Sequence, residues 1–287
     1  MLESVVTDSP DERRSADAYR VSADERAHFE RDGYVHLRSV LSEPELAEIE
    51  AIYQRFLARE IDVPGRDFCD MSGAYGRPVE EFALVNVMLP RKYHPPLQGN
   101  AYERRAASIA EQLLGSDLVI DYDQLLAKCP GRDDAVFEWH QDMAYWPDTP
   151  DTRTASFWLA LDDSTLENGC LRFVPGSHRE PALRPHRPLH DDRDTSHTLV
   201  TSVDPDQDEI RPVPIRRGDV TVHHERVVHG SGGNTTRGWR RAYVLAFRAR
   251  ETVALERKLG FTHSHNDAGD VLDDVGLRSH DEGGETR

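Results

Sequence analysis

Four residues have the types and spacing that metal-dependent chemistry needs. His140 and Asp142 lie two positions apart in the string His-Gln-Asp, and His229 and Arg240 follow within a second string. Two imidazoles and one carboxylate on one face of an ion, with open positions opposite, form the ligand set of non-heme iron(II) sites. A His-x-Asp pair alone recurs by chance in a chain with 14 histidines, so the prediction depends on the ordered set.

The spacing of His140 and Asp142 suits a β-strand. Residues i and i+2 of a strand point to the same face, so both side chains can reach one ion while Gln141 faces away. Arg240 suits a different task, because a planar guanidinium binds a carboxylate through two parallel hydrogen bonds. We therefore consider Arg240 a candidate anchor for an acidic cosubstrate.

Other histidines offer alternatives to this set. His223 and His224, followed by Glu225, make up an alternative group of metal ligands. We interpret His224 instead as a residue that orients the site or touches substrate, and His178 as part of a turn. Further histidines are expected to be solvated and not ligands: His186, His190, His197, His263 and His265.

Helical patterns are confined to the first part of the chain. Three helices are predicted, over residues 22–31, 42–60 and 102–114. The first two begin with Ser22 and Ser42, each followed by a glutamate three positions later, which is the pattern of a capping box. Residues 34–37 are predicted to form a strand, and residues 62–80, rich in Gly, Pro and Asp, a loop.

After residue 118 the pattern changes to short strands. β-Branched and aromatic residues between turn signals predict strands at 118–127, 136–142, 155–162, 170–174, 219–224 and 239–249. Asn168 and Gly169 predict a hairpin turn, because both residue types tolerate a positive φ. Helices followed by many short strands favour a mainly β domain with flanking helices, an α-decorated sandwich or jelly roll.

The predicted strand at 239–249 distinguishes Arg240 from its neighbour Arg241. Arg240 shares a face with small residues that leave room for a ligand: Ala242, Val244 and Ala246. Arg241 shares the other face with bulky residues suited to packing: Trp239, Tyr243, Leu245 and Phe247. Residues 230–238 predict a tight loop that brings this strand beside His229. A surface ion pair remains the alternative for either arginine.

The length of the chain predicts one large domain. It has 287 residues, of which 38% are hydrophobic and 30% charged, enough for a substantial core. We expect a single domain over residues 22–262, a disordered tail over 1–21 and an acidic tail over 263–287. Residues 178–212 contain few apolar side chains and are expected to form a lid loop.

The charge and cysteine content restrict partners and location. A formal net charge of −17 disfavours nucleic acid and anionic membranes. No stretch is apolar enough to cross a membrane, and the first residues do not resemble a signal peptide, so we predict a cytoplasmic protein, monomeric or homodimeric, acting on a small molecule. The three cysteines, Cys69, Cys129 and Cys170, are expected to be reduced. The low lysine content reflects either adaptation of the protein to high salt or a GC-rich coding sequence.

Several strings together resemble the phytanoyl-CoA dioxygenase family. They are Phe-Glu-Trp-His-Gln-Asp at 137–142, Asn-Gly-Cys at 168–170, Val-Pro-Gly-Ser-His at 174–178 and His-Gly-Ser-Gly-Gly-Asn-Thr-Thr-Arg-Gly-Trp-Arg at 229–240. The resemblance covers about residues 22–250 and is most specific in the last string. It implies a double-stranded β-helix, a jelly roll of the cupin-like kind, and an oxygenase dependent on Fe(II), 2-oxoglutarate and O2.

The resemblance also implies roles for individual residues. His140, Asp142 and His229 are expected to bind iron, and Arg240 to hold the far carboxylate of 2-oxoglutarate. Further cosubstrate contacts are expected from Ser231, Trp158 and Gln124. The implied reaction hydroxylates an aliphatic C–H group and releases succinate and CO2, with ascorbate as reductant in vitro. Asp142 argues against halogenation, because related halogenases carry Ala or Gly at that position.

The substrate is open at this level. A free polar or natural-product molecule is preferred over a fatty acyl-CoA thioester, because no basic cluster suggests a binding site for the CoA phosphates. Two alternatives belong to other classes. One is a non-catalytic jelly roll that binds a metal or ligand. The other is a metal-dependent hydrolase or lyase, which would need neither O2 nor Arg240.

Overall fold

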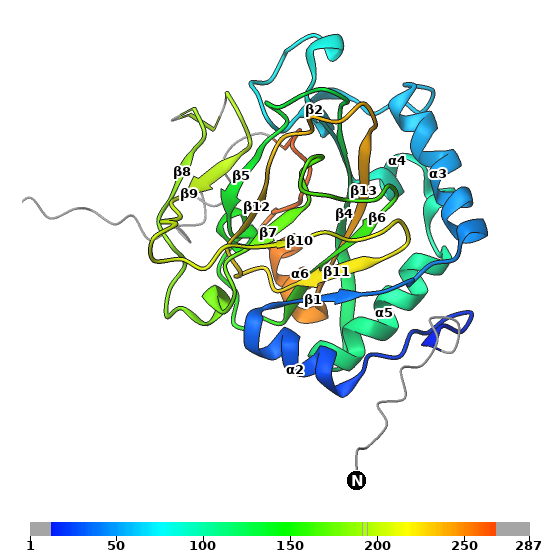
Figure 1. Cartoon of the computed structure of the whole chain (residues 1–287), viewed down its shortest axis with the longest axis vertical. Helices are drawn as coiled ribbons and strands as arrows, with labels where there is room; N and C mark the ends of the chain where they lie inside the picture. Colours follow the sequence, from blue (N-terminus) through cyan, green and yellow to red (C-terminus); the bar gives the residue numbers. More distant parts are fainter. Residues whose placement is uncertain (1–12, 191, 194, 268–287) are drawn as a thin grey trace, which may run out of the picture.

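The computed structural model describes residues 13–190, 192–193 and 195–267. Two antiparallel sheets face each other, and helices cover the outer face of the larger one (Figure 1). This is the arrangement of a jelly roll, so the predicted mainly β domain with flanking helices is confirmed. None of the helices in these residues is long and apolar enough to cross a membrane.

The larger sheet has seven strands in the order β1-β11-β6-β13-β4-β3-β2. Their bounds are β1 Tyr34–Leu37, β2 Phe68–Asp70, β3 Leu84–Met88, β4 Leu118–Lys128, β6 Thr154–Ala160, β11 Val220–His223 and β13 Arg240–Ala249. The smaller sheet has the order β10-β7-β12-β5. Its strands are β5 Phe137–His140, β7 Leu171–Phe173, β10 Arg211–Val213 and β12 His229–Ser231. A third sheet pairs β8 His186–Pro188 with β9 Leu199–Thr201.

The first two helices begin at capping residues that the sequence indicates. The helices are α2 Ala23–Asp32, α3 Glu43–Leu57, α4 Pro90–Tyr93, α5 Ala101–Leu114 and α6 Arg250–Lys258. Short 3-10 turns are η1 Gly65–Asp67, η2 Val79–Glu81, η3 Pro95–Leu97, η4 Asp142–Tyr145 and η5 Ser177–Arg179. Ser22 and Ser42 both form the predicted capping boxes, and α2 ends at Gly33 with φ 81°. α3 ends at Leu57, earlier than predicted, because Arg59 adopts a positive φ of 59°.

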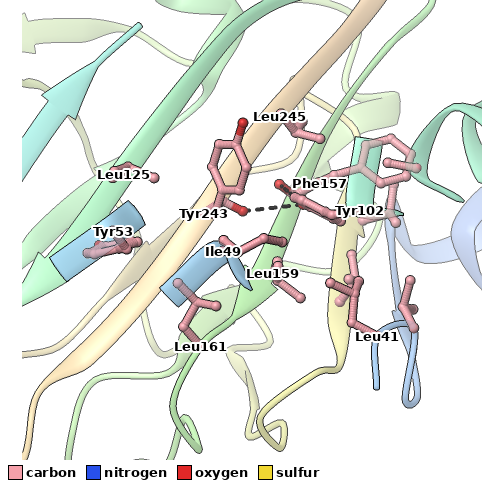
Figure 2. Packing of buried hydrophobic residues seen from close by; sticks show 14 of the residues in the cluster. Leu41, Ile49, Tyr53, Tyr102, Leu125, Phe157, Leu159, Leu161, Tyr243 and Leu245 are labelled. Atoms are coloured by element: carbon pink, nitrogen blue, oxygen red, sulfur yellow. Dashed lines mark hydrogen bonds between the residues drawn. The ribbon is translucent and has the colours of Figure 1, made fainter. Parts of the chain in front are cut away.

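The main core lies between the larger sheet and the helices α3 and α5. Figure 2 shows Ile49 and Tyr53 of α3 together with Phe157 and Tyr243 of the sheet. Period-2 alternation decides which side of β13 enters this core, as predicted: Tyr243 and its same-face neighbours pack here, while Ala242 and Val244 face the smaller sheet. The prediction for Trp239 is wrong, because it precedes the strand and is 39% exposed.

The hydroxyl of Tyr102 connects α5 to the sheet and provides a test of the core. It donates a hydrogen bond to the carbonyl of Phe157 (2.9 Å), with the carbonyl of Tyr243 at 3.3 Å (Figure 2). Tyr102→Phe is expected to lower the free energy of unfolding by about 1–2 kcal/mol, because it removes a buried hydrogen bond. Tyr53→Phe is the matched control, since the buried Tyr53 hydroxyl meets the criteria for a hydrogen bond with none of the described residues. Equal urea midpoints for the two variants would contradict this role.

Several predicted boundaries need correction. The loop predicted at 62–80 contains β2, which pairs with the unpredicted β3. The expected strand at 136–142 ends at His140, and a 3-10 turn starts at Asp142. Asn168-Gly169 forms a turn, with φ 82° at the glycine, but not a hairpin. The strands before and after it, β6 and β7, belong to different sheets.

Both predicted tails contribute residues to the domain. Tyr19 is 1% exposed and Val21 is also buried, so the described end of the predicted tail 1–21 packs on the core. His263 and His265 are buried as well, which contradicts the prediction that the C-terminal tail begins at 263. Residues 1–12 and 268–287, the other parts of the two predicted tails, lie outside the described residues.

The predicted lid segment, 178–212, is more structured than expected. It contains the β8–β9 pair, which lies against β5 and, in Figure 1, opposite α3. Its last residues enter β10 and pair with β7 of the smaller sheet. The three cysteines are free, as predicted.

Candidate active site

A pocket between the two sheets brings together every residue predicted to bind metal or cosubstrate. These are His140, Asp142, His229, Arg240, Ser231, Trp158 and Gln124. The smaller sheet supplies His140 and His229, and the larger sheet supplies Trp158 and Arg240. Strands distant in sequence therefore place these side chains around one volume.

The two candidate histidine ligands lie directly opposite each other in the smaller sheet. His140 at the end of β5 pairs with His229 at the start of β12, and their ring centroids are 4.2 Å apart. The Oδ1 atom of Asp142 lies 3.2 Å from His140 Nε2 and 3.6 Å from His229 Nε2. One potential ligand atom from each of the three residues therefore points to a common position.

Backbone carbonyls hold both imidazoles in the form that binds metals. His140 Nδ1 lies 2.7 Å from the carbonyl of Glu138, and His229 Nδ1 lies 3.0 Å from that of Val227. A carbonyl only accepts, so Nδ1 carries the proton and Nε2 presents its lone pair. Burial also lowers the pKa of His229 well below its usual range, which favours the neutral ring. Two imidazoles and a carboxylate fit Fe(II), whereas Ca²⁺ and Mg²⁺ prefer oxygen ligands.

Asp142 reaches this position by a route that differs from the predicted strand. Gln141 is extended, with φ −122° and ψ 124°, before the 3-10 turn begins at Asp142. Gln141 faces away from the pocket, as predicted, but it is buried. Its side chain accepts a hydrogen bond from Arg184 N (2.8 Å) and donates one to the carbonyl of Arg226 (2.5 Å). These bonds fix the backbone on which Asp142 depends.

Arg240 is a buried positive charge without a carboxylate partner among the described residues. It is 2% exposed, its Nε makes no hydrogen bond, and its guanidinium lies 5.0 Å from the ring centre of Trp158. Burial lowers its pKa to about 10, so it stays protonated at neutral pH. A buried, unpaired cation is costly, and a bound carboxylate would compensate it. The guanidinium therefore fits the far carboxylate of 2-oxoglutarate.

Arg241, the alternative anchor, has partners of its own. Its guanidinium lies 2.6 Å from Asp162 and 2.6 Å from Glu50. Arg241 therefore joins α3 to the larger sheet and points away from the pocket.

The remaining cosubstrate candidates form part of the pocket wall. Trp158, Val244 and Gln124 occupy one cross-strand row of the larger sheet. The side-chain nitrogen of Gln124 donates to Asn86 Oδ1 (2.7 Å), which fixes its amide. Ser231 is buried two positions after His229 on β12.

Three polar residues that line the pocket were not among the predicted site residues: Tyr122, Ser156 and His223. Tyr122 and Ser156 precede Gln124 and Trp158 by two positions, so the period-2 rule of strands contained the necessary signal. His223 belongs to the alternative ligand set, but the three-residue metal group does not include it.

Predictions for several other histidines are wrong. His224 does not line the pocket; it packs against His178, with ring centroids 5.5 Å apart. His186 accepts a hydrogen bond from Gln141 N (3.1 Å), and His197 stacks on His265 at 3.8 Å. These rings are therefore not simply solvated, because they connect loops to the domain. His190 is exposed, as expected.

A second group of potential ligands is already neutralised by arginines. Atoms of Asp121, Glu256 and His263 lie close enough to hold a cation. Arg248 contacts both Asp121 and Glu256, and Arg257 contacts Asp121. The group is therefore an ion-pair network that fastens α6 and the following residues to β4.

Comparisons with known proteins identify relatives of this chain. A family model described as phytanoyl-CoA dioxygenase matches residues 29–242. The peroxisomal phytanoyl-CoA dioxygenase of Rattus norvegicus is 24% identical over 230 residues, which cover 77% of this chain and 67% of that protein.

Two solved structures resemble the domain and hold the groups that the pocket fits. EvdO2 from Micromonospora carbonacea var. aurantiaca, complexed with 2-oxoglutarate, is 34% identical with a TM-score of 0.65, covering 81% of this chain and 92% of that one. The epimerase SnoN in complex with Fe3+, alpha ketoglutarate and nogalamycin RO is 28% identical with a TM-score of 0.59, covering 79% and 82%.

Proposed function

The chain belongs to the phytanoyl-CoA dioxygenase family, and on that premise we propose that it hydroxylates an aliphatic C–H group of a small molecule. The enzyme class is an iron- and 2-oxoglutarate-dependent oxygenase. The type of oxidation, the substrate and the roles of individual residues are the content of the proposal. The non-catalytic jelly roll and the metal-dependent hydrolase or lyase do not fit this class.

One observation carries the proposal: three potential metal ligands and an unpaired buried guanidinium line the same pocket. We assign His140, Asp142 and His229 to iron and Arg240 to the far carboxylate of 2-oxoglutarate. When bound, iron with 2-oxoglutarate supplies the O2-dependent oxidation that yields succinate and CO2.

The chain's own residues orient the metal ligands and the cosubstrate anchor, and they exclude water from the pocket. Backbone carbonyls hold His140 and His229 with Nε2 toward the metal position. Trp158 lies over the Arg240 guanidinium and limits its movement. Apolar walls around the cosubstrate position exclude water and strengthen the carboxylate–guanidinium pair: Leu84, Leu126, Leu171 and Val244.

Hydroxylation is preferred because the third ligand position holds a carboxylate. Asp142 supplies a carboxylate where related halogenases carry Ala or Gly, which leaves a coordination position for chloride in those enzymes. The relative SnoN is an epimerase that acts in nogalamycin biosynthesis, so oxidation without oxygen insertion is a second candidate on the same site.

A free polar or natural-product molecule is the preferred substrate. Arg240 is the only lysine or arginine in the pocket lining, and we assign it to the cosubstrate. No second cation in that lining serves a CoA phosphate. The curated relatives named phytanoyl-CoA dioxygenase favour the alternative, a fatty acyl-CoA thioester. Residues 178–212 remain our candidate lid, and His186 within them accepts a hydrogen bond from the backbone nitrogen of Gln141, next to His140. The cytoplasmic location and the monomeric or dimeric state stay predictions.

Succinate release tests reaction and substrate together. Protein supplied with Fe(II), ascorbate and 2-oxoglutarate is expected to form succinate slowly, and several-fold faster with a true substrate. Free metabolites and natural-product intermediates are compared with CoA thioesters, and mass spectrometry detects the addition of one oxygen atom. A hydroxylated acyl-CoA, with its free acid and the polar compounds inert, would overturn the substrate preference. An oxidised product without added oxygen would overturn hydroxylation.

A further inference from the structure

The two carboxylate oxygens of Asp142 have different surroundings. Oδ1 faces the Nε2 atoms of His140 and His229. Oδ2 points the other way, accepts a hydrogen bond from Ser156 Oγ (2.8 Å) and lies 3.4 Å from His223 Nε2. The larger sheet thus contacts one oxygen and leaves the other to the histidines of the smaller sheet.

Ser156 and His223 are held in place by the fold. They pair with each other across β6 and β11 and project from the same face of the larger sheet. Ser156 is 1% exposed and His223 is 3% exposed. The His223 ring packs against the rings of Phe173 and His229, with centroids at 5.6 and 4.4 Å. Neither residue can turn away to solvent.

The His223 ring lacks full hydrogen bonding. Both nitrogens are buried and make no hydrogen bond to any described residue, although Nε2 is close to Asp142 Oδ2. A buried polar group left unsatisfied is costly, and a phenylalanine would pack against the same two rings without that cost. The Nε2 atom is at a distance from which a small shift of the carboxylate would complete a bond.

We propose that Ser156 and His223 are positioning residues that keep Asp142 bound to the metal through one oxygen. The inference rests on the proposed role of Asp142 as a ligand. A facial set of three protein atoms leaves open positions for a chelating cosubstrate. A second carboxylate oxygen on the metal would take one of these positions. The Ser156 hydrogen bond to Oδ2 and the nearby His223 Nε2 oppose that rotation, so the two residues protect cosubstrate binding more than metal binding.

The test separates binding of the metal from binding of the cosubstrate. Ser156→Ala and His223→Phe are expected to bind Fe(II) within about threefold of the wild type. Their affinity for 2-oxoglutarate under anaerobic conditions is expected to fall about tenfold or more, since Ser156→Ala removes the hydrogen bond to Oδ2 and His223→Phe removes the polar nitrogen beside it. The visible charge-transfer absorption of the Fe(II)–2-oxoglutarate chelate should weaken or shift in both.

Two further variants serve as controls. Ser156→Thr keeps the hydroxyl and is expected to restore affinity and absorption. Ser164→Ala removes another buried hydroxyl, one that has no hydrogen-bond partner and does not line the pocket, and is expected to leave both unchanged.

Each outcome has a defined meaning. Wild-type affinity and absorption in both variants would overturn the inference, as would a parallel loss of Fe(II) and 2-oxoglutarate. If Ser156→Ala fails to fold, His223→Phe and Ser156→Thr decide the matter. A wild-type protein that does not bind 2-oxoglutarate with Fe(II) would instead contradict the proposed function.

Discussion

Replacement of His229 by alanine is expected to abolish product formation and to weaken Fe(II) binding by more than about 100-fold. His229 supplies one of three converging ligand atoms, and its ring lies 4.2 Å from that of His140. Loss of a residue that supports a metal ligand typically costs 10–100-fold in metal affinity or activity, so loss of a ligand itself should cost more in both. His140→Ala and Asp142→Ala are expected to behave alike. Anaerobic Fe(II) titration and succinate formation measure the two effects.

Two other histidines make this prediction specific. His190 is exposed, and His190→Ala is expected to bind iron and form succinate as the wild type does. His223→Phe is expected to bind iron while losing 2-oxoglutarate affinity. Retained iron binding in His229→Ala together with its loss in His223→Phe would show that the metal uses the alternative set around His223.

The site was predictable because its residues occupy short, recognisable strings. The spacing in His140-Gln141-Asp142 and the alternation along β13 are local properties, and the structure retains both. Arg240 could be distinguished from Arg241 because small side chains follow it on the same face. Local pattern therefore indicated His140, Asp142 and Arg240 without any knowledge of how the strands pair, whereas Ser231, Trp158 and Gln124 came from the family resemblance.

Features that depend on contacts distant in sequence were not predictable in this way. β12 is only three residues long, and β3 is an uninterrupted buried run, so neither shows alternation. Asn168-Gly169 has the composition of a hairpin turn, yet the chain passes there from one sheet to the other. A turn sequence indicates that the chain reverses its direction, but it does not indicate which strand the following residues will pair with.

The histidines near the C-terminus illustrate the same limit. His263 and His265 lie in a polar stretch that resembles a tail. They are buried because Asp121 pairs with His263 (2.8 Å) and Asp67 accepts from the backbone nitrogen of His265 (2.6 Å). Both carboxylates are far away in sequence, so composition alone could not indicate these contacts.

Replacement of Arg240 by alanine is expected to weaken 2-oxoglutarate binding by about 10–150-fold. A hydrogen bond to a charged group contributes roughly 1.5–3 kcal/mol, and the paired arrangement here is shielded from water. Arg240→Lys should be intermediate, because lysine keeps the charge but not the planar pair of donors. Calorimetric titration of 2-oxoglutarate into the anaerobic Fe(II) protein measures these differences.

Replacement of the neighbouring Arg241 is expected to affect stability and not 2-oxoglutarate affinity, so Arg241→Ala serves as a matched control. Arg241→Ala leaves the carboxylates of Asp162 and Glu50 without their partner. It should therefore lower the stability of the protein without ligand by about 1–3 kcal/mol, while 2-oxoglutarate affinity changes little. Arg240→Ala removes a buried charge that has no such partner, so the ligand-free protein should lose much less stability.

Thermal unfolding with and without cosubstrate separates the two arginines. With Fe(II) present, 2-oxoglutarate at about 100 times its Kd should stabilise the wild type by about 2.7 kcal/mol. Arg241→Ala should start from a lower midpoint and show the same gain, whereas Arg240→Ala should start near the wild type and gain only about 0.3–1.4 kcal/mol at that concentration. Equal gains in the wild type and Arg240→Ala would mean that the buried guanidinium does not hold the cosubstrate. The unpaired positive charge of Arg240, at the start of β13, would then need another anion as its partner.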